Sequence, residues 1–309
     1  MQVNDNVRMK HFGNFIALLI LAINALFTGL LLLVAYSPYI QPVAHPVQSC
    51  FGLTFPIFAL INGAFLIFWL VIQRYKTALL PLIGFLLCYS QLRTYLPLNF
   101  HTANPPEESI KFLSYNIMGF NGAGKKDGKN PILTYLKESN ADILCLQEYA
   151  SDESPRRLTQ KDIERELKDY PYHRISVVGS GSGYTNKIAC YSKFPILSAR
   201  VLNYPSGYNG SVLYELKLNE DTITLINNHL ESNKLTKADK DIYEDILKAP
   251  EKEKVKSGAR LLVHKLAEAS AIRAPQADTI AREISSSRYP SVIVCGDSVS
   301  YTHLRAHET

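Results

Sequence analysis

Hydrophobic residues follow two different patterns along the chain, and the change comes near residue 100. Residues 12–35, 51–73 and 77–92 carry no charged side chain and are rich in Leu, Ile, Ala and Phe. About 20 apolar residues cross the hydrocarbon core of a bilayer, so the first two stretches predict membrane-spanning helices. The third stretch is shorter and predicts either a short span or an interfacial or re-entrant segment. Residues 1–95 are therefore expected to form a membrane segment.

Beyond residue 109 short apolar runs alternate with charged stretches, which is typical of a domain of strands and helices. The expected strands are Ile110–Ile117, Asp142–Glu148, Tyr172–Val178, Lys187–Ser192, Ser211–Leu218, Thr222–Asn228 and Ser291–Cys295. The expected helices are one that begins at Asn130-Pro131, then Leu158–Asp169, Lys234–Lys248 and Glu251–Ser285. Most strands alternate as in an antiparallel sandwich with helices outside, so residues 110–298 predict an α/β domain. Residues 96–109 contain three prolines and predict a linker.

The first apolar stretch also has the general look of a signal peptide. A signal peptide has a shorter apolar region and ends at a small-residue cleavage site. Here Ser37-Pro38-Tyr39 and a second apolar segment follow instead. The sequence therefore favours a retained span.

Basic residues predict the orientation, because Lys and Arg accumulate in cytoplasmic loops. Arg8 and Lys10 precede the first stretch, Arg74 follows the second, and residues 36–50 contain neither Lys nor Arg. This predicts a multi-pass protein with a cytoplasmic N-terminus. If residues 77–92 span, the rest of the chain lies outside the cytoplasm, and if they do not span it is cytoplasmic.

The charge distribution and the cysteine spacing argue against two classes of protein, a nucleic-acid-binding domain and a protein with a CxxC site. Residues 101–309 carry 28 basic and 27 acidic side chains, so most of the net charge of +5 belongs to the membrane segment. A domain that binds nucleic acid mainly through phosphates is expected to carry a strong basic excess, which is missing here. Cys145, Cys190 and Cys295 lie in apolar runs without a CxxC pattern, so we interpret them as buried small hydrophobic residues.

Residues 119–125 partly match the sequence pattern of a phosphate-binding loop. Residues 119–125 fit the first seven places of the pattern G-x-x-x-x-G-K-[ST], but the eighth place is Lys126, which offers no hydroxyl group to magnesium. The chain then continues to Asn130-Pro131, where a helix should already have begun. We interpret the segment as a mobile basic loop near a substrate.

Polar side chains stand at the ends of four predicted strands: Asn116, Glu148, His229 and Asp297. A single Glu or His after a strand is usually only a solvated end. Four such strand ends together indicate a metal site, because Mg²⁺ prefers a few carboxylate oxygens, keeps several waters and leaves room for a phosphate. The set predicts a magnesium site.

The segments around these residues resemble the ordered motifs of the endonuclease/exonuclease/phosphatase superfamily. They are Leu113–Asn116, Ile143–Glu148, Tyr191–Ile196, Ile226–Ser232 and Val294–Asp297, and the resemblance covers about residues 108–298. The layout resembles membrane-anchored bacterial members of the Bacteroides type. The resemblance implies N-terminal transmembrane α-helices followed by a four-layer α/β/β/α sandwich, with two mixed sheets face to face and helices outside.

The resemblance also implies roles for individual residues. Glu148 matches the magnesium-binding carboxylate, and Asn116 matches the amide that orients the metal and the phosphate. His229 matches the histidine that contacts the phosphate or the leaving oxygen, and Asp297 the aspartate that positions the attacking water or stabilises the phosphorane. Asn186 is a candidate substrate-binding contact to the phosphate. The implied cofactor is Mg²⁺, with Mn²⁺ as an alternative.

The residues after Asp297 depart from the family pattern, which continues with an Asn two places on, further strands and a terminal Asp-His pair. Val299 stands in the Asn position, and residues 299–309 resemble the translation of a sequencing adapter. We interpret them as a non-native tail and the domain as incomplete at its C-terminus. A genuine tail in which His303 and His307 bind a metal is the alternative. A sandwich that lacks strands leaves sheet edges unpaired, so we expect the chain as written to fold poorly and to have little activity.

The leading hypothesis is a membrane-anchored, magnesium-dependent phosphodiesterase, nuclease or phosphatase in the bacterial inner membrane, with its catalytic domain in the periplasm. Its partners are the lipid bilayer and a phosphoester: a lipid head group, a small phosphoester or a nucleic acid. The balanced charge favours the first two. The alternative is a catalytically inactive binding or scaffold protein of the same fold. A transporter is disfavoured, because the apolar stretches carry no charge.

Overall fold

The computed structural model describes residues 2–96, 106, 109–122, 130–151, 158–181, 184–233, 239 and 252–298. The chain divides into two compact units, Met1–Ala103 and Asn104–Thr309. Several predicted segments lie outside the described residues: nearly all of the helix Lys234–Lys248, most of the linker 96–109, the basic loop after Gly122, and the tail 299–309.

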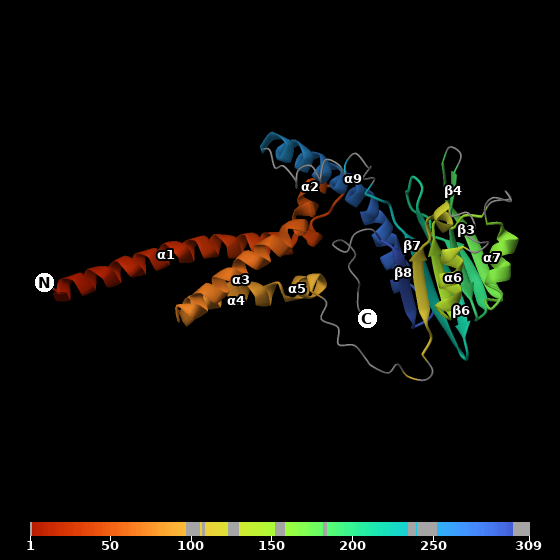
Figure 1. Ribbon diagram of the computed structural model, residues 1–309, viewed down its shortest axis with the longest axis horizontal. Coiled ribbons are helices and arrows are strands. Elements are labelled where there is room, and N and C mark those ends of the chain that lie inside the picture. Colours follow the sequence, from red (N-terminus) through yellow and green to blue (C-terminus); the bar gives the residue numbers. More distant parts are fainter. Residues whose placement is uncertain are drawn as a thin grey trace. The chain divides into compact units, whose positions relative to one another are not determined.

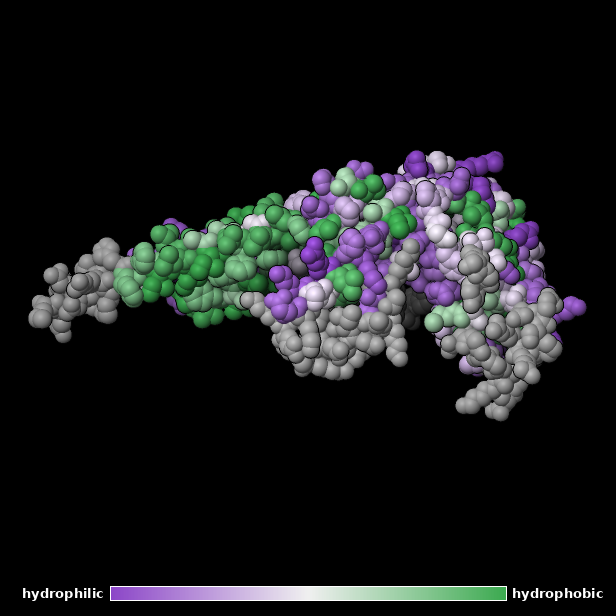
Figure 2. Space-filling view, turned by 90° about the horizontal axis from the view of Figure 1, so that it is seen from above, coloured by the Kyte–Doolittle hydropathy of each residue, from purple (hydrophilic) through white to green (hydrophobic). Residues whose placement is uncertain are grey.

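The first unit is helical (Figure 1). Its elements are α1 (Gln2–Ala35), η1 (Ser37–Tyr39), α2 (Pro46–Ser49), η2 (Cys50–Thr54), α3 (Phe55–Val71), α4 (Tyr75–Leu87) and α5 (Tyr89–Tyr95), where η marks a 3-10 helix. Two helical stretches, Phe12–Tyr39 and Pro46–Val71, are long and apolar enough to cross a membrane. Figure 2 shows the hydrophobic surface that these helices expose.

All three predicted apolar stretches contain helix, but two of them have different bounds. The stretch 51–73 begins with the 3-10 turn η2 and is α-helical only over α3. The stretch 77–92 is broken at Cys88, between α4 and α5. At a rise of about 1.5 Å per residue, α4 is about 20 Å long, which is shorter than a hydrocarbon core of about 30 Å. That the third stretch spans stays a prediction.

Helices α1 and α3 pack against each other through buried polar side chains. Thr28 Oγ1 donates a hydrogen bond to Asn62 Oδ1 (2.7 Å), and Trp69 Nε1 donates to Asn24 Oδ1 (3.1 Å). The Asn62 amide also donates to the carbonyl oxygen of Phe58 (2.8 Å). Polar groups in apolar surroundings need partners, so this network favours one register of α1 against α3.

The second unit contains two four-stranded sheets, with the strand orders β1-β2-β4-β3 and β5-β6-β7-β8. The strands of the first are β1 (Phe112–Asn116), β2 (Ile143–Gln147), β3 (Tyr172–Gly181) and β4 (Tyr184–Ser192). Those of the second are β5 (Ile196–Val201), β6 (Gly210–Leu218), β7 (Asp221–His229) and β8 (Val292–Asp297). The helices are η3 (Met118–Gly122), α6 (Pro131–Glu138), α7 (Gln160–Glu166) and α9 (Lys252–Ser285). The β1–β2 and β7–β8 pairs are parallel and the other pairs antiparallel, so both sheets are mixed, as predicted.

Side chains alternate across the sheets and build four layers, as strand β2 illustrates. Ile143 and Cys145 face the second sheet and belong to the core between the sheets. Leu144 and Leu146 face the other way, into the cluster that also contains the buried side chains of α6 and α7. The outer face of the second sheet is covered by α9, which contributes Ile280. Figure 1 shows α9 on one side of the strands and α7 on the other, and the predicted α/β/β/α sandwich is confirmed.

Strand β5 is the element that sequence patterning missed. Only Ile196 of its six residues is buried, because β5 is the edge strand of its sheet. An edge strand with one buried side chain lacks the apolar alternation on which a strand prediction rests. The prediction that Cys145 and Cys190 are buried is confirmed, whereas Cys295 is half-buried.

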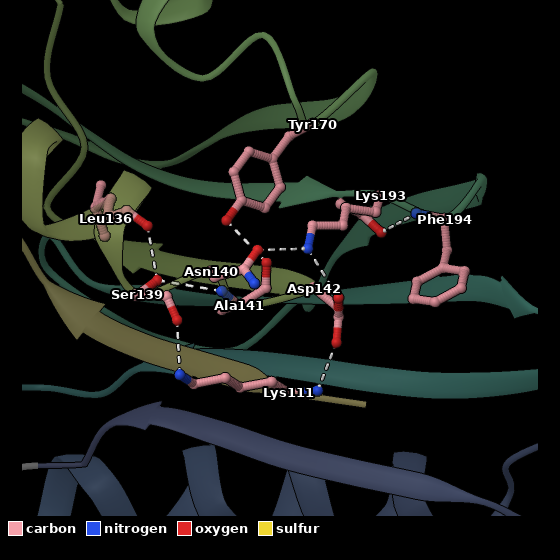
Figure 3. Close-up of polar contacts among 10 residues, drawn as sticks. Lys111, Leu136, Ser139, Asn140, Ala141, Asp142, Tyr170, Lys193 and Phe194 are labelled. Atoms are coloured by element: carbon pink, nitrogen blue, oxygen red, sulfur yellow. Dashed lines mark hydrogen bonds and ion pairs between the residues drawn. The ribbon is translucent and has the colours of Figure 1, made fainter. Parts of the chain in front are cut away.

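A polar cluster holds the N-terminal end of β2, opposite to the end where Glu148 lies (Figure 3). Lys193 Nζ contacts Asp142 Oδ1 (3.0 Å) and Asn140 Oδ1 (3.1 Å), and the Lys111 amide donates to Asp142 Oδ2 (2.8 Å). Burial acts to raise the pKa of Asp142, but these two lysines outweigh it and lower the pKa. The cluster ties the start of β1 and the β4–β5 turn to the start of β2.

Candidate functional site

Side chains from the ends of four strands meet at one place. Asn116 and Glu148 come from the first sheet, and His229 and Asp297 are register partners on the parallel strands β7 and β8. The Asn116 Nδ2 atom donates hydrogen bonds to Glu148 Oε1 (2.8 Å) and to Asp297 Oδ2 (2.9 Å). A single nitrogen atom therefore joins carboxylates that belong to different sheets.

Local backbone geometry aims these side chains. Glu148 follows the last residue of β2 with a φ of 52°, a left-handed conformation that costs a non-glycine residue of the order of 1 kcal/mol or more. Gly296 has a φ of +131°, and a Cβ atom there would lie 2.0 Å from the carbonyl oxygen of Asn228. Only glycine permits this approach of β8 to β7, and the next residue is Asp297.

His229 is nearly enclosed, with 5% of its side chain exposed. Its Nε2 atom lies 3.6 Å from Glu148 Oε1, and its Nδ1 atom lies 3.2 Å from Asn186 Nδ2. Burial lowers the pKa of His229, although the carboxylates of Glu148, Asp297 and Glu231 act in the opposite direction. The neutral imidazole is therefore favoured near neutral pH.

Asn186 lies deeper, on β4, and is 2% exposed. Besides His229, its Nδ2 atom contacts Asn209 Oδ1 (3.0 Å) and the carbonyl oxygen of Tyr208 (3.3 Å). Sequence reasoning missed Asn209. The Asn209-Gly210 pair before the predicted strand Ser211–Leu218 is a turn signal, and nothing in it points to a site 20 residues further along the chain, at His229.

A second buried contact joins the sheets beneath the site. Gln147 Nε2 donates to Asn227 Oδ1 (2.6 Å), and both side chains are at most 1% exposed. Gln147 also donates to Ser114 Oγ (3.2 Å) on β1. Glu148 directly follows Gln147, and His229 lies two residues after Asn227, so this bridge holds the two halves of the site in register.

All five residues that the sequence singled out therefore lie in one connected group. Asn116, Glu148, Asp297 and His229 approach one another directly, and Asn186 joins them through His229. They do not line the large groove of about 930 Å³ that lies between residues 203–205 and the α9 segment Pro275–Ser286. The chemistry of the group depends on its hydrogen bonds and carboxylates.

The donor set is suited to a hard divalent cation. Glu148 and Asp297 bring carboxylate oxygens within 3 Å of the same atom, Asn116 Nδ2, and the Glu148 side chain is 39% exposed. No cluster of three or more His, Cys, Asp or Glu side chains that could hold a metal ion occurs in the described part of the chain. Magnesium needs no such cage, because it is usually held by one or two carboxylates, waters and substrate phosphates.

Comparison with known families gives two matches. A family described as the endonuclease/exonuclease/phosphatase family matches residues 113–297, which is more than half of the chain. A family described as a domain of unknown function matches residues 17–95. No curated protein sequence matches the chain.

Comparison with solved structures gives matches that include the following three, and the chain spans less than two thirds of the length of each. The endonuclease/exonuclease/phosphatase from Beutenbergia cavernae is 12% identical (TM-score 0.34), with 45% of this chain and 42% of that one covered. A humanized D. rerio TDP2 is 14% identical (TM-score 0.35; 64% and 63% covered). A Staphylococcus aureus beta toxin mutant with bound magnesium ions is 19% identical (TM-score 0.38; 61% and 64% covered).

Proposed function

The chain belongs to the endonuclease/exonuclease/phosphatase family, and on this premise we propose that it is a membrane-anchored, Mg²⁺-dependent hydrolase of phosphoester bonds. Members of the family are phosphoester hydrolases. One observation carries the proposal: Glu148 and Asp297 converge on Asn116 from different sheets, with His229 Nε2 3.6 Å from Glu148 Oε1. A carboxylate pair beside a buried imidazole provides the groups that metal-assisted hydrolysis of a phosphoester needs.

Glu148 and Asn116 are proposed to hold the metal, which is Mg²⁺ or alternatively Mn²⁺. The Glu148 carboxylate would hold the cation together with the amide oxygen of Asn116, Oδ1, which accepts from the Met118 amide (3.1 Å). A bound Mg²⁺ would neutralise the charge that develops on the phosphate oxygens. The half-exposed Glu148 carboxylate leaves room for waters and a phosphate on its solvent side.

His229 and Asp297 are proposed to act on the substrate. The imidazole Nε2 atom faces the carboxylate end of the site, where it donates a hydrogen bond or a proton to the phosphate or the leaving oxygen. The Asp297 carboxylate orients the attacking water. The two residues are register partners on β7 and β8, so the sheet itself fixes the distance between the water-positioning group and the hydrogen-bond donor.

The anchor is proposed to consist of the two long apolar helical stretches of the first unit and of residues 77–92 as a third, short span, in the inner membrane of a bacterium. The catalytic unit then faces the periplasm and works close to the bilayer. Its nearly balanced charge favours a lipid head group or a small phosphoester over nucleic acid. A salt titration separates these substrates, because nucleic-acid binding weakens steeply as salt increases.

The proposal is tested by turnover of a chromogenic phosphodiester by the full chain in detergent, with Mg²⁺ and with EDTA. We expect slow hydrolysis that EDTA abolishes, slow because Val299 stands where the family pattern has an Asn. Replacing His229 by Ala removes the hydrogen-bond donor and should reduce kcat at least about 100-fold. The matched control is His264→Ala, since that imidazole is 68% exposed on α9 and should be dispensable.

Hydrolysis that persists in EDTA, or a His229→Ala variant as fast as the wild type, would overturn the proposal. Binding of a phosphoester without any turnover would instead support the inactive binding protein of the same fold.

A further inference from the structure

A chain of buried hydrogen bonds lies behind the imidazole of His229, and no sequence motif predicted it. It runs from the carbonyl oxygen of Leu230 to the Asn209 amide, from there to the Asn186 amide, and from Asn186 to His229 Nδ1. The residues Asn209, Asn186 and His229 are 6%, 2% and 4% exposed. None of the links depends on solvent, so the orientation of each group is set by the protein.

The orientations of the two side-chain amides follow from two backbone carbonyl groups, those of Leu230 and Tyr208. A carbonyl oxygen only accepts, so the Asn209 atom 2.7 Å from the Leu230 oxygen must be the Nδ2 donor. Asn209 then presents Oδ1 to Asn186, whose Nδ2 atom donates to it (3.0 Å) and lies 3.3 Å from the carbonyl oxygen of Tyr208. Both amide orientations are therefore fixed without any assumption about the histidine.

The last link decides the state of the imidazole. Asn186 Nδ2 carries two hydrogens, which Asn209 Oδ1, the Tyr208 oxygen and His229 Nδ1 share, and it accepts none. A proton on Nδ1, 3.2 Å away, would therefore face a donor, and an unprotonated Nδ1 is favoured. In a neutral imidazole the proton then sits on Nε2, which lies 3.6 Å from Glu148 Oε1. We propose that Asn209 is a positioning residue, which acts through Asn186 to hold His229 in the tautomer that carries its proton on Nε2, toward the site.

The loop that carries Asn209 is built to hold this position. Gly179 is the register partner of Asn186 and follows an irregularity in β3, and a Cβ atom on it would lie 1.9 Å from the Tyr208 oxygen. The backbone N–H of Asn209 donates to Ser206 Oγ (3.1 Å), which in turn donates to Glu231 Oε2 (3.1 Å). The loop is thus fastened on both sides of Asn209, as expected of a support for a catalytic group.

The inference rests on the proposed function only where it concerns turnover, because the tautomer itself is measurable without substrate. The full chain is labelled with ¹⁵N-histidine in detergent, and the His229 signals are identified by their loss in His229→Gln. The ¹⁵N shifts of a protonated and an unprotonated ring nitrogen are well separated, so the spectrum reports which nitrogen carries the proton. We expect the Nε2-protonated form in the wild type.

Asn209→Ala should convert this signature to a mixture of tautomers and, with Mg²⁺ and a chromogenic phosphodiester, reduce kcat about 10- to 100-fold with little change in KM. The matched control is Asn203→Ala, an exposed Asn at the other end of the same loop, which should change neither quantity. If Asn209→Ala does not fold, the isosteric Asn186→Asp takes its place. Its carboxylate only accepts, so it should move the proton to Nδ1.

An Nδ1-protonated His229 in the wild type overturns the inference. So does a wild-type spectrum in Asn209→Ala, or in Asn186→Asp where that variant replaces it. If the tautomers respond as expected but the wild type hydrolyses no phosphoester, the proposed function fails and the positioning role stands.

Discussion

At the scale of single residues, the candidate site consists of a small number of polar atoms that contact one another. One amide nitrogen, Asn116 Nδ2, is shared by Glu148 Oε1 and Asp297 Oδ2, and one imidazole lies within 3.6 Å of the first of these oxygens. Two carboxylates close to one another repel unless a donor or a cation lies between them. The Asn116 amide supplies that donor, which makes the same place suitable for a divalent ion.

The residue-scale prediction concerns the charge of Glu148. Glu148→Gln keeps the shape and the hydrogen bonding of the side chain but removes its charge. Loss of an outer-shell partner already weakens a metal site about 10- to 100-fold, so loss of a charged ligand should reduce Mg²⁺ affinity at least about tenfold. Titration calorimetry with MgCl₂ on the full chain measures it. Glu138→Gln, on the exposed surface of α6, is the control, and equal affinities in the two variants would contradict the assignment.

At the scale of elements, the site depends on two places where backbones approach more closely than a side chain permits. Gly296 brings β8 against β7, and Gly179 brings β3 against the loop that precedes β6. The first approach sets the position of Asp297. The second sets the carbonyl oxygen of Tyr208, which is one of the acceptors of the Asn186 amide. The packing of these strands and loops therefore determines where the Asp297 carboxylate and the Tyr208 carbonyl oxygen lie.

The element-scale prediction compares two glycines of this region. Gly179→Ala places a Cβ atom 1.9 Å from the Tyr208 oxygen, so β3 or the loop must move. Overpacking of this kind costs about 1–3 kcal/mol of unfolding free energy. Gly207→Ala, in the same loop, meets no atom within 4 Å and should change stability by less than about 1 kcal/mol. Thermal denaturation of the full chain in detergent measures both, and equal melting temperatures would show that the close approach is absent.

At the scale of the whole molecule, the chain combines an apolar helical unit with an α/β sandwich that carries the candidate site. The helices leave many large apolar side chains exposed, among them Leu60 (76%) and Val71 (74%), and bury polar ones such as Asn62 (0%). This inversion of the usual soluble pattern is what a lipid environment favours. If the helical unit is the proposed membrane anchor, the side on which the second unit lies depends on whether the short helices α4 and α5 span.

The whole-molecule prediction tests that side. Lys168→Cys places a thiol on an exposed position of the catalytic unit, while Cys50, Cys88, Cys145 and Cys190 are buried. We expect an impermeant maleimide to label the variant in intact cells, because three spans put the unit outside the cytoplasm. The unaltered chain gives the background, and Ala44→Cys, in the loop between the first two spans, gives the positive control. Labelling of Lys168→Cys only after lysis would mean that residues 77–92 do not span.

Some features of this protein are encoded locally, and the sequence by itself determined them. The apolar stretches predicted the helical unit, and period-two alternation predicted most strands. Both patterns are local, because the burial of one face of a helix or strand determines which neighbouring residues are apolar. The same logic placed Asn116, Glu148, His229 and Asp297 at strand ends. Where the local signal was weak it failed, as for the edge strand β5 with its single buried residue.

Other features depend on residues far apart in the chain, and only the tertiary structure decided them. Asn116 and Asp297 are 181 residues apart, and their contact exists because the two sheets pack face to face. Asn209 became part of the site through an amide on another strand and a glycine that lets its loop approach. Such contacts arise from the packing of sheets and loops, and no periodicity in the sequence records them. The strand ends could therefore be read from the sequence, but the hydrogen-bond chain behind His229 could not.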